Sequence, residues 1–128
     1  MTFDFPWPHS GLSPNARVDR WTKAKRVKAY RHGVAWEAKA AGIQKLDAAA
    51  AHLRITFCPP DARRRDLDNM LGSIKPALDG LSDVLGVDDS RWSLTIERGP
   101  IVARGRVRIT ISPEPAEAVQ IPIVGKIS

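Results

Sequence analysis

The sequence has few of the features expected of a secreted or membrane protein. Cys58 is the single cysteine, so no disulfide can form within the chain, which suits a reducing compartment. No apolar run approaches the roughly 20 residues that cross a bilayer. The first residues lack the basic start and the apolar stretch of a signal peptide. We therefore expect a cytoplasmic protein without membrane contact.

Histidine is also scarce, and its distribution excludes some chemistry. His9, His32 and His52 are scattered without the short spacing of metal ligands. We assign them no catalytic role.

The chain is long enough for one domain with its own core. It has 128 residues, of which 43% are hydrophobic and 27% charged, as in ordinary soluble domains. Its net charge of +6 predicts a polyanionic partner. Residues 17–45 contain nine basic and two acidic residues, whereas residues 66–89 contain six aspartates and one lysine. A nucleic-acid-binding protein without catalytic activity has little use for the acidic segment, but a metal-dependent nuclease needs both.

Hydrophobic periodicity predicts the secondary structure. Alternating apolar residues predict strands around residues 3–5, 53–57, 92–96 and 107–111. Helical spacing predicts one helix from near Thr22, as its N-cap, to Gly42, and a second from about Asp68. Pro76 should kink or divide the second helix. The apolar stripe of this helix comprises Leu71, Ile74, Leu78, Leu81 and Leu85.

This order, strand-helix-strand-helix-strand-strand, predicts an α+β fold. We expect a small mixed β-sheet with the two main helices packed on it. Residues 99–105 form the connection between the last two strands. These strands are therefore predicted to be an antiparallel pair.

Carboxylates are concentrated next to three arginines. Residues 63–69 read RRRDLDN, and Asp88 and Asp89 follow about twenty residues later. Asp66 and Asp68 point the same way if the backbone there is extended; alternatively, Asp68 caps the helix. Mg²⁺ prefers oxygen ligands, commonly one or two carboxylates with water and phosphate. The pattern predicts a metal site beside arginines that grip phosphate.

The second helix adds a polar row to this cluster. Lys75 and Asp79 return to the face of Asp68 in an unbroken helix, and Gly72 in the same row would let a bulky ligand approach. Simpler explanations exist for each part. In these explanations the aspartates are solvated caps and turns, Lys75 and Asp79 are a surface pair, and the arginines are a solvated run. The joint occurrence of these features favours the site.

Several motifs together resemble one known family. These are FDFPWP at 3–8 with SPN at 13–15, RRDLDN at 64–69, KPALDGL at 75–81 and GVDDS at 86–90. In order and spacing they are similar to the RusA-type Holliday junction resolvases, which are endodeoxyribonucleases of phages and prophages. The resemblance covers roughly residues 3–112. It implies an endonuclease domain over residues 1–112, followed by a C-terminal tail, residues 113–128.

The resemblance implies roles for individual residues. Asp66, Asp68 and Asp89 would be the metal-binding carboxylates, and Lys75 the catalytic lysine. The lysine follows the second aspartate by seven residues, where the family pattern has four. Three extra residues keep it on the same helix face but shift it by about 4.5 Å. The residues expected to hold DNA phosphates are Arg17, Arg20, Lys23, Arg63, Arg64 and Arg65.

The implied protein is a homodimer that binds four-way DNA junctions in a bacterial or phage-infected cell. It would use Mg²⁺, with Mn²⁺ as a possible substitute, to nick two opposed strands symmetrically. The nicks would leave 5′-phosphate and 3′-hydroxyl ends, in DNA recombination and repair. Two alternatives stay open: a non-catalytic branched-DNA-binding protein of phage origin, and a flap or fork nuclease.

The tryptophans are the remaining candidates for DNA contact. Trp7, in a proline-rich loop, is the best candidate to stack on an exposed base. For Trp36 and Trp92 we expect core or interface packing, the commoner fate of tryptophan.

Overall fold

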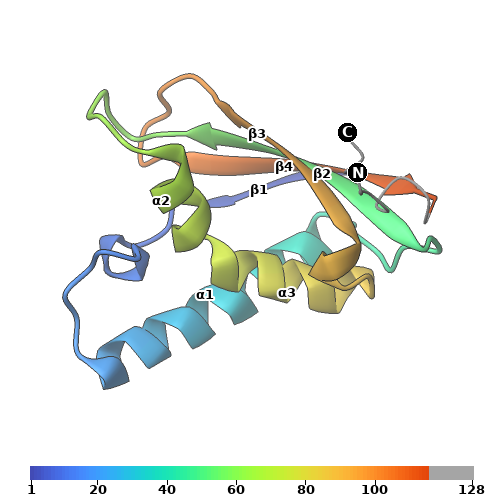
Figure 1. Cartoon of the computed structure of the whole chain (residues 1–128), viewed down its shortest axis with the longest axis horizontal. Helices are drawn as coiled ribbons and strands as arrows, with labels where there is room; N and C mark the ends of the chain where they lie inside the picture. Colours follow the sequence, from blue (N-terminus) through green and yellow to red (C-terminus); the bar gives the residue numbers. More distant parts are fainter. Residues whose placement is uncertain (116–128) are drawn as a thin grey trace, which may run out of the picture.

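A computed structural model describes residues 1–115 as a four-stranded mixed sheet with helices on one face (Figure 1). The predicted tail falls mostly on residues 116–128, outside the described part, although the last strand continues two residues past 112. The elements are, in chain order, β1 Thr2–Pro6, the 3₁₀ helix η1 Ser10–Leu12, α1 Arg20–Ala40, β2 Ala50–Cys58, α2 Leu67–Ser73, α3 Lys75–Leu85, the 3₁₀ helix η2 Asp89–Arg91, β3 Trp92–Arg98 and β4 Arg106–Glu114.

The strand order in the sheet is β1-β4-β2-β3. β4 is antiparallel to both β1 and β2, while β3 is parallel to β2. The predicted antiparallel pairing of the last two strands is therefore wrong. Their connection crosses the end of β2 instead: Gly99 N donates to Phe57 O at 2.8 Å, and Val102 N donates to Pro59 O at 2.9 Å. The parallel pair β2–β3 needs a long crossover, which α2 and α3 supply.

The first helix begins slightly earlier than predicted. Its N-cap is Asp19, not Thr22, and the Asp19 carboxylate accepts a hydrogen bond from Thr22 N at 2.8 Å. A carboxylate at this position satisfies a free amide of the first turn, which explains the choice of residue. The helix ends just before Gly42, as predicted, and Gly42 has a positive φ of 88°.

The second predicted helix is divided into α2 and α3. The break lies at Ile74, and Pro76 stands at the start of α3, where its missing N–H costs nothing. The N-cap position of α2 is Asp66 rather than Asp68, and its side chain makes no capping hydrogen bond.

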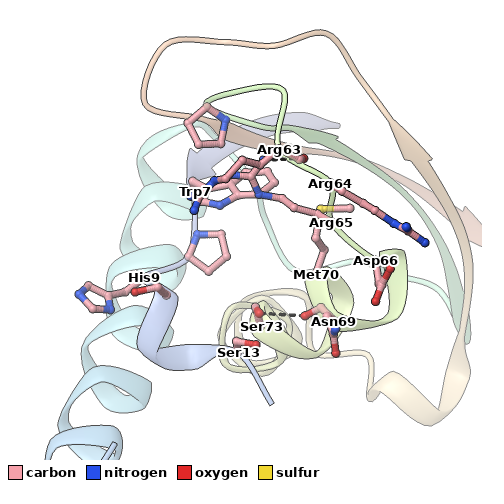
Figure 2. Close-up of a pocket in the computed structure, with 13 residues that line it drawn as sticks. Trp7, His9, Ser13, Arg63, Arg64, Arg65, Asp66, Asn69, Met70 and Ser73 are labelled. Carbon is pink, nitrogen blue, oxygen red and sulfur yellow. Dashed lines mark hydrogen bonds between the residues drawn. The ribbon is translucent and has the colours of Figure 1, made fainter. Parts of the chain in front are cut away.

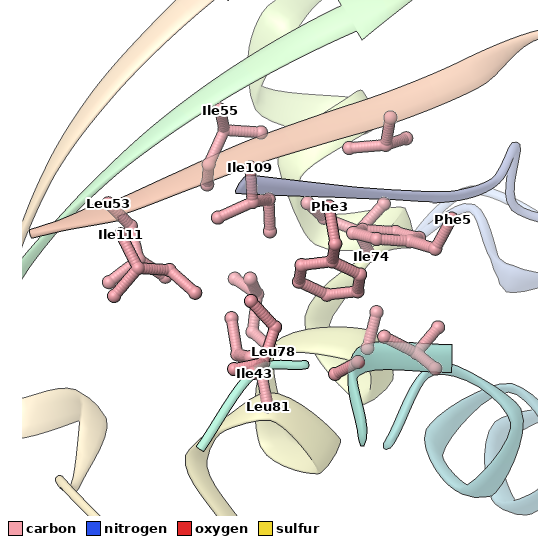
Figure 3. Packing of buried hydrophobic residues seen from close by; sticks show 14 of the residues in the cluster. Phe3, Phe5, Ile43, Leu53, Ile55, Ile74, Leu78, Leu81, Ile109 and Ile111 are labelled. Atoms are coloured by element: carbon pink, nitrogen blue, oxygen red, sulfur yellow. The ribbon is translucent and has the colours of Figure 1, made fainter. Parts of the chain in front are cut away.

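The core lies between the sheet and the helices (Figure 3). Alternate residues of the strands, such as Phe5, Leu53 and Ile109, are fully buried against the helices. The predicted stripe of the second helix is confirmed, since Ile74, Leu81 and their neighbours in the row face this core. The opposite face of the sheet is polar and carries ion pairs such as Arg54–Glu97 and Arg108–Asp4. The core thus holds α2 and α3 against the sheet, and the polar side chains of these two helices lie at the edge of the core.

Candidate active site

A cavity of about 430 Å³ lies between α2, α3 and the start of β3. We call it the lysine groove. It combines an apolar floor with three charged side chains that the sequence singled out. Its lining residues are Asp68, Leu71, Gly72, Lys75, Leu78, Asp89, Trp92 and Leu94.

Lys75 is the centre of the charge network in the groove. Its Nζ lies 2.7 Å from Asp79 Oδ1 and 2.9 Å from Asp89 Oδ2. The hydrogen bonds to Asp79 and then Asp89 raise the pKa of Lys75 above its usual range. The ammonium group is therefore charged at neutral pH. It is also accessible, because 56% of its side chain is exposed.

Lys75 lies in the groove despite its unusual spacing and the division of the helix. Lys75 is the first residue of α3, immediately after the break at Ile74. The seven-residue separation from Asp68 still leaves both side chains in one cavity.

The loop that carries Asp89 is held firmly. Gly86 ends α3 with a positive φ of 69°, and Trp92 Nε1 donates to Val87 O at 3.0 Å. Asp88 accepts a hydrogen bond from Ser90 N at 3.0 Å, and its hydrogen bonds to Ser90 lower the pKa of Asp88. Asp88 is thus used to cap η2, which leaves Asp89 to face Lys75. Trp92 is partly buried against the core, in agreement with the expected packing role.

Gly72 does not leave space for a ligand in the way that the sequence suggested. A Cβ atom at Gly72 would lie 2.7 Å from Pro14 Cγ, so the missing side chain accommodates the loop before α1.

A second cavity, of about 540 Å³, lies beside the first turn of α2 (Figure 2). We call it the arginine cavity. It is built by the loop after β1, the loop after β2 and α2. Its lining residues are Trp7, Pro8, His9, Ser10, Ser13, Pro60, Arg63, Arg64, Arg65, Asp66, Asn69, Met70 and Ser73.

The three arginines have different environments. Arg65 is only 16% exposed; its Nη1 lies 2.9 Å from Asp61 Oδ1 and also donates to two backbone carbonyls. Its guanidinium lies 5.5 Å from the centre of the Trp7 ring. Arg63 is exposed and lies 3.5 Å from Asp61, and Arg64 is exposed as well. The side chain of Arg65 therefore makes its contacts within the protein, while Arg63 and Arg64 are accessible to phosphate.

The predicted metal ligands are divided between the two cavities. Asp68 and Asp89 line the lysine groove, whereas Asp66 lines the arginine cavity. Within residues 1–115, no group of three or more His, Cys, Asp or Glu side chains is arranged to hold a metal ion. Asp68 and Asp89 alone are hard oxygen donors in one accessible cavity, which fits Mg²⁺, because this ion commonly takes one or two carboxylates. A three-carboxylate site stays a prediction.

The family model for endodeoxyribonuclease RusA matches residues 8–112, which include all four predicted catalytic residues. The chain belongs to the RusA endodeoxyribonuclease family. Membership implies the function of a Holliday junction resolvase nuclease, and the family binds branched DNA junctions. The chain is also 38% identical over 117 residues to an uncharacterized protein of Xylella fastidiosa (strain Temecula1 / ATCC 700964), a match that covers 88% of this chain and 76% of that protein. In the part that the structure describes, no helix is both long and apolar enough to cross a bilayer.

The remaining DNA-binding candidates of this RusA-family protein lie apart from both cavities. Arg20 and Lys23 line a separate cavity between α1 and Asp83, and Arg17 is exposed in the loop before α1. Trp36 is 71% exposed on α1, so core packing is wrong for this residue, and interface packing stays a prediction. Trp7 is half-buried and contacts Phe57 edge-on, with a ring separation of 6.2 Å.

Asp79 is the site residue that sequence reasoning did not assign. It contacts Lys75 directly, yet the sequence allowed a simple surface pair. The signal was its spacing of four residues from Lys75, which is common to surface pairs and functional pairs alike.

Proposed function

We propose that this protein is a Mg²⁺-dependent, structure-selective endonuclease that resolves Holliday junctions by paired symmetric nicks. The nicks leave 5′-phosphate and 3′-hydroxyl ends, and the reaction serves DNA recombination and repair. The observation that carries the proposal is the meeting of Asp68, Lys75 and Asp89 in one accessible groove. Membership of the RusA family supplies the substrate class.

The residues of the groove have separable roles in this proposal. Asp68 and Asp89 would hold the metal, and Asp66, two residues before Asp68 in the sequence, is the third proposed ligand. When bound, Mg²⁺ supplies the acidity that converts water into an attacking hydroxide. Lys75 stays protonated and stabilises negative charge that develops on the phosphate and on the departing 3′-oxygen. Arg63 and Arg64 bind flanking phosphates without reading sequence.

The four-way junction also gives a reason for a dimer. A junction has near two-fold symmetry, and a two-fold symmetric protein presents two equivalent sites to it. We therefore propose a homodimer in which each subunit nicks one of two opposed strands. Sedimentation of the protein with and without a junction would measure its state, and a monomer in both conditions would contradict the dimer.

The proposal is tested by incubating an end-labelled four-way junction with the protein, with and without Mg²⁺ or Mn²⁺. We expect symmetric nicks that need the metal and that DNA ligase can reseal. Asp68→Asn should abolish them, while Asp83→Asn, an exposed aspartate of α3 outside the groove, should not. If Asp68→Asn cuts as well as the parent protein, the metal assignment is wrong.

A second candidate is a branched-DNA-binding protein without catalytic activity. It is favoured by one observation: within the described range 1–115, the three predicted carboxylates do not gather. This candidate predicts salt-sensitive junction binding with no cleavage in either metal. Comparing four-way, flap and fork substrates in the same assay also tests the flap or fork alternative.

A further inference from the structure

The outer side of α1 carries two exposed tryptophans that the proposed nuclease site does not use. Trp21 is 78% exposed and Trp36 is 71% exposed. Tryptophan is usually largely buried, so two accessible rings on one helix indicate a contact surface. The half of α1 that contains Trp21 extends beyond α3 (Figure 1).

Helix geometry places both rings in one row with basic residues. At about 100° and 1.5 Å per residue, Trp21 and Trp36 differ by about 60° around the helix and about 22 Å along it. Val34 and Ala38, which are buried in the core, lie on the other side of α1. We call the exposed row the tryptophan stripe. Its members, which lie within about 80° of each other, are Trp21, Lys25, Lys28, His32, Trp36 and Lys39.

The tryptophan stripe has positive charge and no carboxylate. The acidic residue within α1, Glu37, is half-buried and lies 4.0 Å from Arg106 of β4, away from the stripe. Three lysines without a neighbouring carboxylate attract a polyanion. They also repel a second copy of the same stripe, because like charges would face each other. The charge therefore favours a nucleic acid over a self-interface.

A basic cavity of about 630 Å³ runs along one side of the stripe. Lys28 and His32 belong to both. The one carboxylate that lines the cavity, Asp83, is paired with Arg31 at 2.8 Å, so the cavity stays cationic overall. A basic trough beside exposed aromatic rings is the arrangement that binds single-stranded nucleic acid: the trough follows the phosphates, and the bases stack on the rings. In a duplex the base faces are already covered, and the tryptophans would add nothing.

We propose that the tryptophan stripe and the adjacent cavity bind single-stranded DNA, with bases stacked on Trp21 and Trp36 and phosphates held by the lysines between them. DNA is the expected nucleic acid because the family acts on DNA. The cavity shares no lining residue with the lysine groove. The site is thus separate from the place of cleavage and does not depend on the proposed nuclease function. It holds the protein on branched DNA that contains an unpaired segment.

The test measures fluorescence anisotropy of a labelled oligothymidylate of about 16 nucleotides, at the upper end of single-strand site sizes. Divalent metal is left out, so the result does not require cleavage. Trp21→Ala and Trp36→Ala should each weaken binding at least about fivefold, whereas Trp36→Phe, which keeps an aromatic face, should retain most of the affinity. Lys25→Gln should lower the slope of log affinity against log salt by about 0.7. The control Ile101→Ala removes an exposed apolar side chain, 57% accessible, outside α1 and should bind as the parent does.

Thermal unfolding checks that each variant keeps its fold, which exposed positions should tolerate. The proposal is overturned if both alanine variants bind the oligonucleotide as tightly as the parent, or if a duplex of the same length binds as well and loses as much with each variant. Tighter binding of oligouridylate would reassign the site to RNA. A parent that sediments as a dimer and a Trp36→Ala variant that sediments as a monomer would instead make the stripe an interface between copies of the chain.

Discussion

Asp79→Asn tests whether the charge network of the lysine groove positions Lys75. The substitution removes the nearer of the two carboxylates that contact Lys75, at 2.7 Å, and leaves Asp89 at 2.9 Å. The amide has nearly the same shape, so packing is preserved. Lys75 then loses the partner that holds it on α3, and its ammonium is drawn toward Asp89 alone.

The expected effects on stability and on turnover differ in size. Both side chains are substantially exposed, and an exposed i, i+4 pair contributes only about 0.3–0.5 kcal/mol to folding. Removing a positioned charge altogether costs about 10²–10³ in turnover, as expected for Lys75→Ala. Misplacing it by less than 1 Å should cost less, about tenfold. Junction affinity should change little.

The assay is single-turnover cleavage of a labelled junction, with binding and urea unfolding measured in parallel. Asp83→Asn is the matched control, because it is the same change on the same helix and also breaks an ion pair, with Arg31 at 2.8 Å. We expect the control to lose the same small amount of stability and to keep the turnover of the parent protein. Equal turnover for the two variants would refute the positioning role of Asp79.

Three further predictions concern the metal, the arginine cavity and the packing of the helices. Asp68→Asn should weaken Mg²⁺ binding about tenfold by calorimetry and leave junction binding unchanged or tighter, since a repulsive charge is removed; a large loss of DNA affinity would contradict this. The hydrogen bond from Arg65 holds the pKa of Asp61 at about 2, below the usual 3.8. A lowered pKa in the folded protein means that Asp61 stabilises the fold above about pH 4 and stops doing so as pH falls toward 2. The difference in urea midpoint between the parent and Asp61→Asn should therefore vanish over that interval, and a constant difference would exclude the ion pair as its cause. Gly80→Ala would place a Cβ 2.4 Å from a backbone carbonyl of α1, so we expect a loss of about 1–3 kcal/mol in the free energy of unfolding; Gly33→Ala, in open space on α1, should instead gain up to about 1 kcal/mol.

The local hydrophobic pattern predicted the helices and strands well, because it records for each residue whether its side chain faces the core. Alternation in the strands and three- or four-residue spacing in the helices follow from which side chains face the core, as at Leu53, Ile74 and Leu81. Pro76 predicted the division of the second helix for an equally local reason, its missing N–H. Each of these features is readable from a short window of sequence.

Strand pairing was mispredicted because it is not a local property. A seven-residue connection between two strands fits a hairpin, but here it crosses the end of β2 and pairs with Phe57 and Pro59 on the way. β2 pairs with β4 on one side and with β3 on the other, so both partners come from distant parts of the chain.

The sequence by itself determined which residues carry charge and chemistry: the aspartates, Lys75 and the arginines, together with a family resemblance in their order. Only the tertiary structure decided how they are grouped. Asp68, Lys75 and Asp89 meet because α3 and the loop before β3 return to the same edge of the core, whereas Asp66 faces a different cavity and Arg65 is used internally. The physical reason is that side-chain direction and partner choice depend on the packing of segments far apart in the chain, which no short stretch of sequence encodes.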